Sequence, residues 1–408
     1  MATIGPFQAL RPAPELASQV ASRPYDVLNS HEAREEAADN PYSFLHITKP
    51  EIDMPLDVDT HSQPVYDQAK KNLQSFIEKG ILLQEDKPCY YIYRLVMNGK
   101  SQTGLVCASS VDDYEKDIIK KHELTRPDKE NDRINHMKTI RAQTGNVFMA
   151  YKDVTAIDDL VESWKNSHAP LYDFIAGDGI GHTVWVVDDD DSIRAITALF
   201  AQEVPFTYIA DGHHRAASAA KVRKALGAAA SSDSGYFLTT LFPAAQLQIL
   251  DYNRLVHDLN GAGPEELLNK LQKDFFIGKV DNAFAPGQLH EFGLYLDGNW
   301  YQLVAKEGSY TTDPIGVLDV TILQKNILDK LLAIKDPRTD KRIDFVGGIR
   351  GLSELEKRVD NGEMKAAFSL YPVSIQQLFD IADSGEIMPP KSTWFEPKLR
   401  DGLLTHLI

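Results

Sequence analysis

Apolar residues recur along the chain with two different periods, and segments of the two kinds follow one another. The clearest helical spacing runs over Val65–Gly80, where apolar residues return every three or four positions and the glycine ends the pattern. Two β-rich runs, Cys89–Met97 and Thr103–Ser109, flank Asn98-Gly99, a dipeptide typical of a tight hairpin turn. The sequence therefore predicts an amphipathic helix followed by a β-hairpin.

Further helices and strands alternate through the rest of the chain. Helices are expected over Asn29–Asp39, from Val111 to Lys121, from an N-cap at Thr125 to about Gln143 with Gly145 as the stop, and over Asp158–Ser167, Ser192–Gln202, Arg215–Ala230, Pro264–Asp274, Val317–Ile334 and Leu352–Asp360. Strands are expected over Val147–Tyr151, His182–Val187, Phe206–Ala210, Tyr236–Phe242, Leu247–Leu250 and within Phe292–Val304. This alternation predicts an α/β (or α+β) fold with a mixed sheet and flanking helices.

The chain is expected to fall into three regions. Residues 1–110 combine a Pro-rich, irregular strap with the hairpin, residues 111–260 carry the polar motifs described below, and residues 261–408 form a C-terminal α/β region packed on them.

Charge and cysteine content narrow the class of protein. The 408 residues hold 43 Lys and Arg against 59 Asp and Glu, a net charge of −16, which argues against binding of nucleic acid because phosphate backbones would be repelled. Two cysteines form no disulfide framework, and no secretory signal or membrane-spanning apolar run is found. A soluble cytoplasmic protein of bacterial type is expected.

The sharpest local signal is the turn Asp211-Gly212-His213-His214-Arg215, between a predicted strand and a predicted helix. A helix N-terminus presents free backbone N–H groups, which makes such a turn an anion site, and Gly212 lets the backbone approach a ligand closely. Arg215 and the histidines suit phosphate oxygens, and Asp211 suits Mg²⁺ or a proton. The plain alternative is that Asp211 caps the helix and the histidines face solvent.

A second polar cluster precedes the helix that starts near Thr125. Glu123 beside His122 is a candidate general base or metal ligand, and Arg126 is placed to hold an anion. The alternative for this cluster is a charged surface without chemistry. For the following stretch, Asp132–Arg141, a solvated helix face with paired charges is favoured.

Four separated stretches resemble one bacterial family, domain of unknown function 1015: SRPYDVL at 22–28, KHELTRPDKENDR at 121–133, YIADGHHRAASA at 208–219 and PPKSTWFEPKL at 389–399. That family in turn resembles the ParB/sulfiredoxin-like superfamily, which includes nucleotide switches and free serine kinases that use ADP or ATP. The resemblance spans almost the whole chain and implies a ParB/sulfiredoxin-like core at 111–260 with large additions on both sides.

The resemblance also implies roles for the two polar clusters. The expected site residues are Glu123, Asp211 and His214 for catalysis; Gly212, His213, Arg215, His122 and Arg126 for phosphate or nucleotide; and Asp211 for the metal. Glu123 is the favoured base because Lys121 and Arg126 lie close to it in sequence, and His31-Glu32 is a rival pair.

Two functions of different kinds follow as hypotheses. The first is a phosphotransferase that uses ATP or ADP with Mg²⁺ and acts on a small hydroxyl-bearing metabolite, for example a serine-like one. The alternative is a ParB-like nucleotide-binding switch, or partner-binding protein, without phosphotransfer. A homodimer is one expectation for its assembly, and fold alone does not fix the reaction.

Overall fold

The computed structural model describes residues 1–227 and 231–408 as two compact units. Unit 1 contains residues 1–247 and the last twelve residues of the chain, 397–408, and unit 2 contains residues 248–396. The boundaries expected at 110/111 and 260/261 do not coincide with this division, because the first falls inside unit 1 and the second inside unit 2. The C-terminus therefore returns to the unit in which the chain began.

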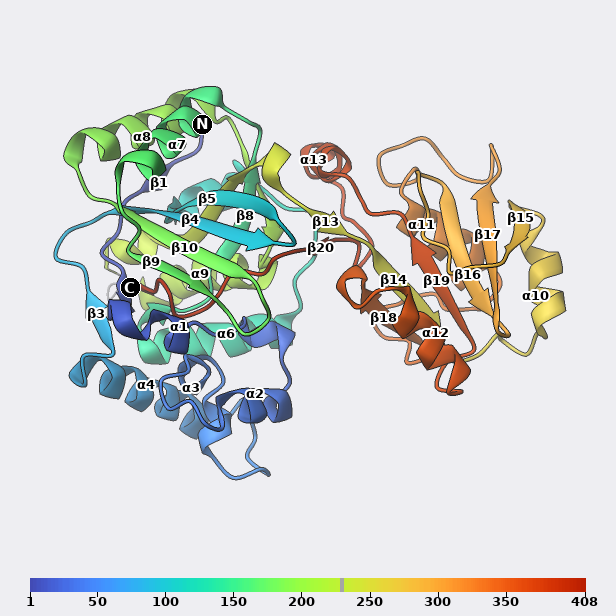
Figure 1. The fold of residues 1–408 in the computed structure, drawn as a ribbon, viewed down its shortest axis with the longest axis horizontal. Coiled ribbons are helices and arrows are strands. Elements are labelled where there is room, and N and C mark those ends of the chain that lie inside the picture. Colours follow the sequence, from blue (N-terminus) through green and yellow to red (C-terminus); the bar gives the residue numbers. More distant parts are fainter. Residues whose placement is uncertain (228–230) are drawn as a thin grey trace. The chain divides into compact units, whose positions relative to one another are not determined.

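Unit 1 is built on a mixed sheet, as the alternating pattern predicted (Figure 1). Within the described residues nine strands form it, in the order β6-β11-β8-β12-β5-β4-β10-β9, with β1 paired to β5. Their bounds are β1 (Ile4–Gly5), β4 (Tyr90–Met97), β5 (Lys100–Ser110), β6 (Ile119–Lys120), β8 (Val147–Tyr151), β9 (Tyr172–Ile175), β10 (Gly181–Val187), β11 (Thr207–Asp211) and β12 (Tyr236–Pro243). The pairs β11–β6 and β12–β8 are parallel, and the others are antiparallel.

The predicted hairpin is confirmed. Asn98 and Gly99 both have positive φ, 52° and 75°, as a tight turn that matches the strand twist requires. Strands β4 and β5 then pair in antiparallel register from Met97–Lys100 to Tyr91–Val106.

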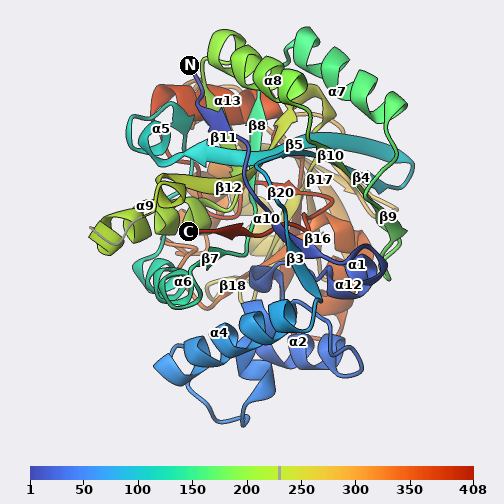
Figure 2. The same cartoon turned by 90° about the vertical axis from the view of Figure 1, so that its left-hand side faces the viewer.

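Helices pack around the sheet of unit 1 (Figure 2). Their bounds are α1 (Ala17–Val20), α2 (Ser30–Ala37), α3 (Leu45–Thr48), α4 (Gln63–Glu78), α5 (Val111–Glu115), α6 (Pro127–Ile140), α7 (Thr155–Ser167), α8 (Asp190–Glu203) and α9 (His213–Leu226). Side chains of α7, α8 and α9 share one buried cluster with alternate residues of the sheet, for example Trp164, Phe200 and Ala216 with Met149.

Several helix boundaries differ from the prediction. Helix α5 is much shorter than Val111–Lys121, because β6 begins at Ile119. The N-cap of α6 is Arg126, not Thr125, whose hydroxyl instead donates to Glu130. Helix α9 begins two residues before Arg215, and the predicted end at Ala230 lies outside the described residues.

The solvated face expected on α6 is wrong. Arg133 and His136 are buried, as is Glu130 one turn earlier. The guanidinium of Arg133 lies 4.0 Å from the centroid of the Tyr25 ring and pairs with Asp132. His136 donates from Nε2 to the carbonyl of Ile47 at 2.8 Å. Arg133 and His136 thus contact the N-terminal region, whose position the local sequence of α6 does not reveal.

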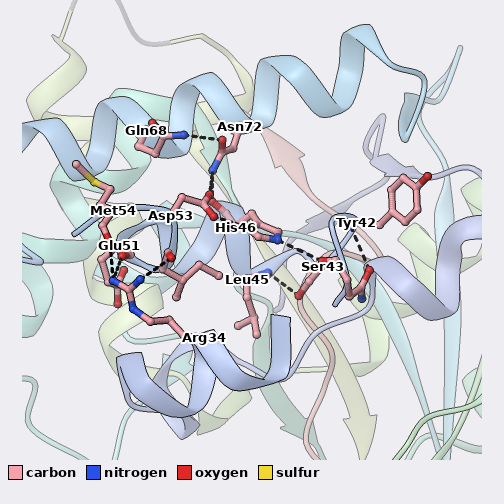
Figure 3. A network of polar contacts seen from close by, with 12 residues as sticks. Arg34, Tyr42, Ser43, Leu45, His46, Glu51, Asp53, Met54, Gln68 and Asn72 are labelled. Atoms are coloured by element: carbon pink, nitrogen blue, oxygen red, sulfur yellow. Dashed lines mark hydrogen bonds and ion pairs between the residues drawn. The ribbon is translucent and has the colours of Figure 1, made fainter. Parts of the chain in front are cut away.

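The N-terminal helices α2, α3 and α4 lie together and are held by a polar network around His46 (Figure 3). Nδ1 of His46 lies 2.7 Å from the carboxylate of Asp53, and Nε2 lies 3.2 Å from the carbonyl of Asn40. Both partners only accept hydrogen bonds, so both ring nitrogens must carry protons. The hydrogen bond to Asp53 accordingly raises the pKa of His46, and Asn72 donates to the other oxygen of Asp53.

Unit 2 has its own antiparallel sheet, in the order β15-β17-β16-β19-β14-β18. The strands are β14 (Tyr252–Val256), β15 (Phe275–Val280), β16 (Glu291–Leu296), β17 (Asn299–Ala305), β18 (Ile343–Gly347) and β19 (Ala366–Leu370), with a separate pair β13 (Ile249–Leu250) and β20 (Trp394–Phe395). Its helices are α10 (Pro264–Leu271), α11 (Asp319–Leu323), which continues as a π-helix over Gln324–Asp329, α12 (Leu352–Asp360) and α13 (Ile375–Ser384). Of the elements of unit 2, the sequence did not predict β14, β15, β19, β20 and α13.

No helix in the described part of the chain combines the length and the apolar character that crossing a membrane requires.

Candidate functional site

The candidate site is the junction between strand β11 and helix α9. Gly212 joins them with φ 99° and ψ 29°, a left-handed conformation that side chains disfavour, and it serves as the N-cap of α9. A Cβ at this position would also lie 3.4 Å from Cζ of Arg215. The helix starts at His213, so the backbone N–H groups of its first turn have no partner inside the helix. This local geometry is the one that the sequence motif predicted.

Asp211, the last residue of β11, is ion-paired on two sides. Its Oδ2 lies 3.2 Å from Nζ of Lys398 and 3.7 Å from Nη2 of Arg215. Burial works against ionisation of this carboxyl, but the charges of Lys398 and Arg215 outweigh burial and hold its pKa well below the ordinary value. Asp211 is therefore a carboxylate at any physiological pH.

Arg215 is buried, with only 4% of its side chain exposed; both Nη atoms have partners, whereas the buried Nε has no hydrogen-bond partner among the described residues. Nη1 donates to the carbonyl of Asn146, and Nη2 lies 3.0 Å from Asp26. Gly145 makes room for the side chain, because a Cβ there would lie 2.9 Å from Cδ of Arg215. Gly145 thus has a packing role beside Arg215, whereas the predicted stop of α6 is already reached at Arg141, which adopts a left-handed conformation.

His213 links the turn to the second polar cluster. The backbone N–H of His122 donates to Nε2 of His213 at 3.4 Å, so the ring proton of the neutral imidazole sits on Nδ1. Nδ1 lies 3.7 Å from the carboxylate of Glu123. Burial and the adjacent His122 ring lower the pKa of His213 well below its ordinary value, so the ring stays neutral. The structure therefore brings Glu123 to the first residue of α9, although 90 positions separate the two in the sequence.

His214 lies on the side of α6. The backbone N–H of Arg126 donates to Nε2 of His214 at 3.0 Å, which leaves the proton of the neutral ring on Nδ1. Burial lowers the pKa of His214, so this neutral form is favoured. The side chain of Arg126 itself points to Asp128, 2.9 Å away, in an exposed pair. Arg126 thus contacts the motif through its backbone.

Of the remaining candidates, His122 lies beside the turn and the rival pair His31-Glu32 lies in helix α2. His122 is buried and packs edge-on against His213, with ring centroids 4.5 Å apart, and burial lowers its pKa to about 4. The rival pair is occupied elsewhere: Glu32 forms the capping box of α2 with Asn29, and His31 lies 3.5 Å from Glu35. Glu123 is therefore the carboxylate of the two candidates that contacts the Asp211–Arg215 turn.

Residues 4–321 match a family model described as "Protein of unknown function (DUF1015)". The chain belongs to this family. The wider kinship of the DUF1015 chain with the ParB/sulfiredoxin-like superfamily stays a prediction. No curated protein matches the DUF1015 chain.

Solved structures resemble the DUF1015 chain only distantly. A free serine kinase in complex with AMP is 12% identical with a TM-score of 0.36, and the match covers 74% of this chain and 92% of the kinase. A conserved hypothetical protein from Pyrococcus furiosus is 14% identical with a TM-score of 0.37, over 74% and 95% of the two chains. C-terminally truncated SbnI from Staphylococcus aureus is 12% identical with a TM-score of 0.38, over 74% and 87%. Similarity at this level assigns no activity.

The structure places at the turn two charged residues that were not among the predicted site residues, Asp26 and Lys398. They lie 189 and 187 positions away from their partners Arg215 and Asp211. Both fall within stretches that carry the family resemblance in the DUF1015 chain, SRPYDVL and PPKSTWFEPKL. That coincidence was the available signal, because neither residue has a local pattern that indicates a site.

The residues at the turn do not form a resident metal site. Within residues 1–227 and 231–408 no group of three or more His, Cys, Asp or Glu side chains is arranged to hold a metal ion. The carboxylate of Asp211 already faces two cations, Lys398 and Arg215, which would repel a dication. The prediction of Asp211 as a metal ligand therefore finds no support in this arrangement.

Proposed function

We propose that this protein binds the phosphates of ATP or ADP at the β11–α9 junction and transfers the terminal phosphoryl group to a small metabolite that carries a hydroxyl. The observation that carries the proposal is the contact between Glu123 and His213 at the first turn of α9. This contact puts a candidate base beside a candidate phosphate site, and transfer of a phosphoryl group to a hydroxyl uses both.

The phosphate site rests on the start of helix α9. The free N–H groups of its first turn and the positive end of its dipole favour an anion there. His214 adds a donor, because Arg126 occupies Nε2 and leaves the proton on Nδ1. Each of these groups donates a hydrogen bond to phosphate oxygen without itself carrying a full charge.

Glu123 is the proposed general base. Its side chain is 43% exposed, so a substrate hydroxyl can reach it, and Nδ1 of His213 lies 3.7 Å from its carboxylate on the buried side. In the proposed step the acceptor hydroxyl oxygen bonds to the terminal phosphorus while the bond from phosphorus to the bridging oxygen breaks. The hydroxyl proton passes to Glu123, and ADP leaves, or AMP when ADP is the donor.

Any Mg²⁺ in this reaction would arrive with the nucleotide. Mg²⁺ commonly keeps several waters and is held by substrate phosphates with few protein carboxylates, so no preformed cluster is needed. Its part would be to neutralise phosphate charge. The first turn of α9 and His214 would bind the phosphate oxygens, and Glu123 would accept the hydroxyl proton.

The test compares two glutamate variants in a transfer assay. Wild type, Glu123→Gln and Glu32→Gln are incubated with Mg²⁺, terminally labelled ATP or ADP, and a panel of small hydroxy acids and hydroxy amino acids. Glu32→Gln is the matched control because glutamine also serves in the capping box of α2. We expect Glu123→Gln to lower turnover by roughly 10²–10⁴-fold with nucleotide affinity unchanged, and the control to retain wild-type turnover.

Three results would argue against this function in different ways. Loss of turnover in Glu32→Gln but not in Glu123→Gln would move the base to the rival residue. Nucleotide binding with a change of oligomeric mass and no turnover in wild type would favour the switch. Absence of nucleotide binding in wild type would remove both.

A further inference from the structure

The last twelve residues of the chain are part of unit 1 and begin beside the candidate site. Backbone hydrogen bonds tie Asp401 to Ser22, at 2.9 and 3.0 Å, and Thr405 to Leu10, at 2.9 Å in both directions. Strand β21 (His406–Leu407) then pairs with β7 (Ala142–Gln143), directly after helix α6. The segment is therefore a fixed part of unit 1 and can hold a side chain at a defined place.

Arg400 fixes this segment near its start. Its Nε lies 3.3 Å from Nε2 of His182, its backbone N–H donates to the hydroxyl of Tyr93 at 3.4 Å, and its guanidinium pairs with Asp178. Burial, together with the charge of Arg400, lowers the pKa of His182 to about 3, so the imidazole is neutral and can accept from the guanidinium. The buried side chain of Arg400 thus holds the backbone in place two residues after Lys398.

Of the two cations that pair with Asp211, Lys398 is the more accessible one. The Lys398 side chain is 18% exposed, against 4% for Arg215. The two Nη atoms of Arg215 pair with Asn146, Asp26 and Asp211, and its Nε is buried without a hydrogen-bond partner among the described residues, so a phosphate could reach this guanidinium only by opening a buried network. The ammonium of Lys398 carries three donors on a flexible stem, and Asp211 holds it 3.2 Å away.

We propose that Lys398 is the residue whose side chain contacts the nucleotide phosphates, with Asp211 holding its ammonium in place and Arg400 positioning the segment that carries it. This inference rests on the proposed function and extends it, because it assigns to the C-terminal segment the charge that the sequence motif had placed on Arg215. The role requires no movement of the buried arginine.

The experiment measures affinity along a ligand series that differs only in phosphates. Adenosine, AMP, ADP and ATP are titrated into wild type, Lys398→Met, Lys398→Arg and Lys224→Met by calorimetry at fixed ionic strength. Lys224→Met is the matched control, since it removes a lysine–carboxylate pair (with Glu115, 2.7 Å) from the last turn of the same helix α9.

We expect Lys398→Met to weaken ADP and ATP by roughly 10–100-fold and to leave adenosine unchanged, because one charge-assisted hydrogen bond to phosphate is lost. Lys398→Arg should recover most of the affinity, and Lys224→Met should match wild type.

The outcomes separate this inference from the proposed function. If wild type binds nucleotides and Lys398→Met binds them equally well, the role of Lys398 is refuted and the proposed function stands. If Lys398→Met weakens adenosine as much as ATP and also lowers the unfolding temperature, Lys398 only pins the C-terminal segment. If wild type binds none of the four ligands, the proposed function fails and the role of Lys398 falls with it.

Discussion

Removal of the Arg215 guanidinium gives the sharpest test of how the turn is built. In Arg215→Met the side chain keeps an apolar stem but loses its contacts with Asn146, Asp26 and Asp211. Breaking a buried ion pair typically costs 3–5 kcal/mol. Because Asp26 and Asp211 are each about a third exposed, water can partly rehydrate them, and we expect a loss of about 3 kcal/mol in the free energy of unfolding.

Urea and thermal unfolding of the whole chain measure this loss. For a unit of about 250 residues, such as unit 1, each kcal/mol shifts the melting temperature by about 2–4 °C, so the variant should melt about 6–12 °C lower. Arg126→Met is the control, because it removes an exposed pair with Asp128 that contributes at most about 1 kcal/mol. Equal melting temperatures for the two variants would refute the view that Arg215 organises the turn.

Three further variants test other parts of the account by unfolding measurements. The pKa of His46 is raised, so the stabilisation from its pair with Asp53 is complete below about pH 6.5 and is lost as pH rises through the pKa of the folded state. The difference in unfolding free energy between wild type and His46→Gln should therefore shrink from pH 5 to pH 9. A constant difference would refute the claim that His46 is protonated in the folded protein. Burial raises the pKa of Asp401 to about 7, so the contribution of this group to the stability of wild type falls as pH rises from 4 to 7. Asp401→Asn should therefore gain roughly 1–3 kcal/mol relative to wild type over that range, and parallel curves would contradict this. Gly212→Ala forces a side chain onto φ 99° and should cost about 1–2 kcal/mol, whereas an unchanged stability would mean that the turn relaxes freely.

Local sequence patterns correctly predicted the elements whose structure depends on nearby residues alone. The β4–β5 hairpin follows from one dipeptide and two β-rich runs, and β8 has the predicted bounds, Val147–Tyr151. Helix α6 shows the limit. Its charged face reads as solvated, yet Arg133 is buried under Tyr25, which lies more than a hundred residues earlier in the chain. A charge pattern reports which residues are polar but not which distant segment will cover them.

The candidate site divides in the same way. The Asp211–Arg215 turn could be predicted because a strand, a glycine and a helix start are local features. The accessibility of each side chain could not, since the burial of Arg215 depends on Asp26 and on the room left by Gly145. For the same reason the pairing of Lys398 with Asp211 was not predicted, because only the return of the C-terminal segment to unit 1 brings the two together.

The position of bound phosphates tests the central claim most directly. A crystal structure of the full chain with a non-hydrolysable ATP analogue should place phosphate oxygens about 3 Å from backbone N–H groups of His213–Arg215, with Glu123 facing the terminal phosphate. Phosphates found in another part of the protein, with the Asp211–Arg215 turn untouched, would contradict the account.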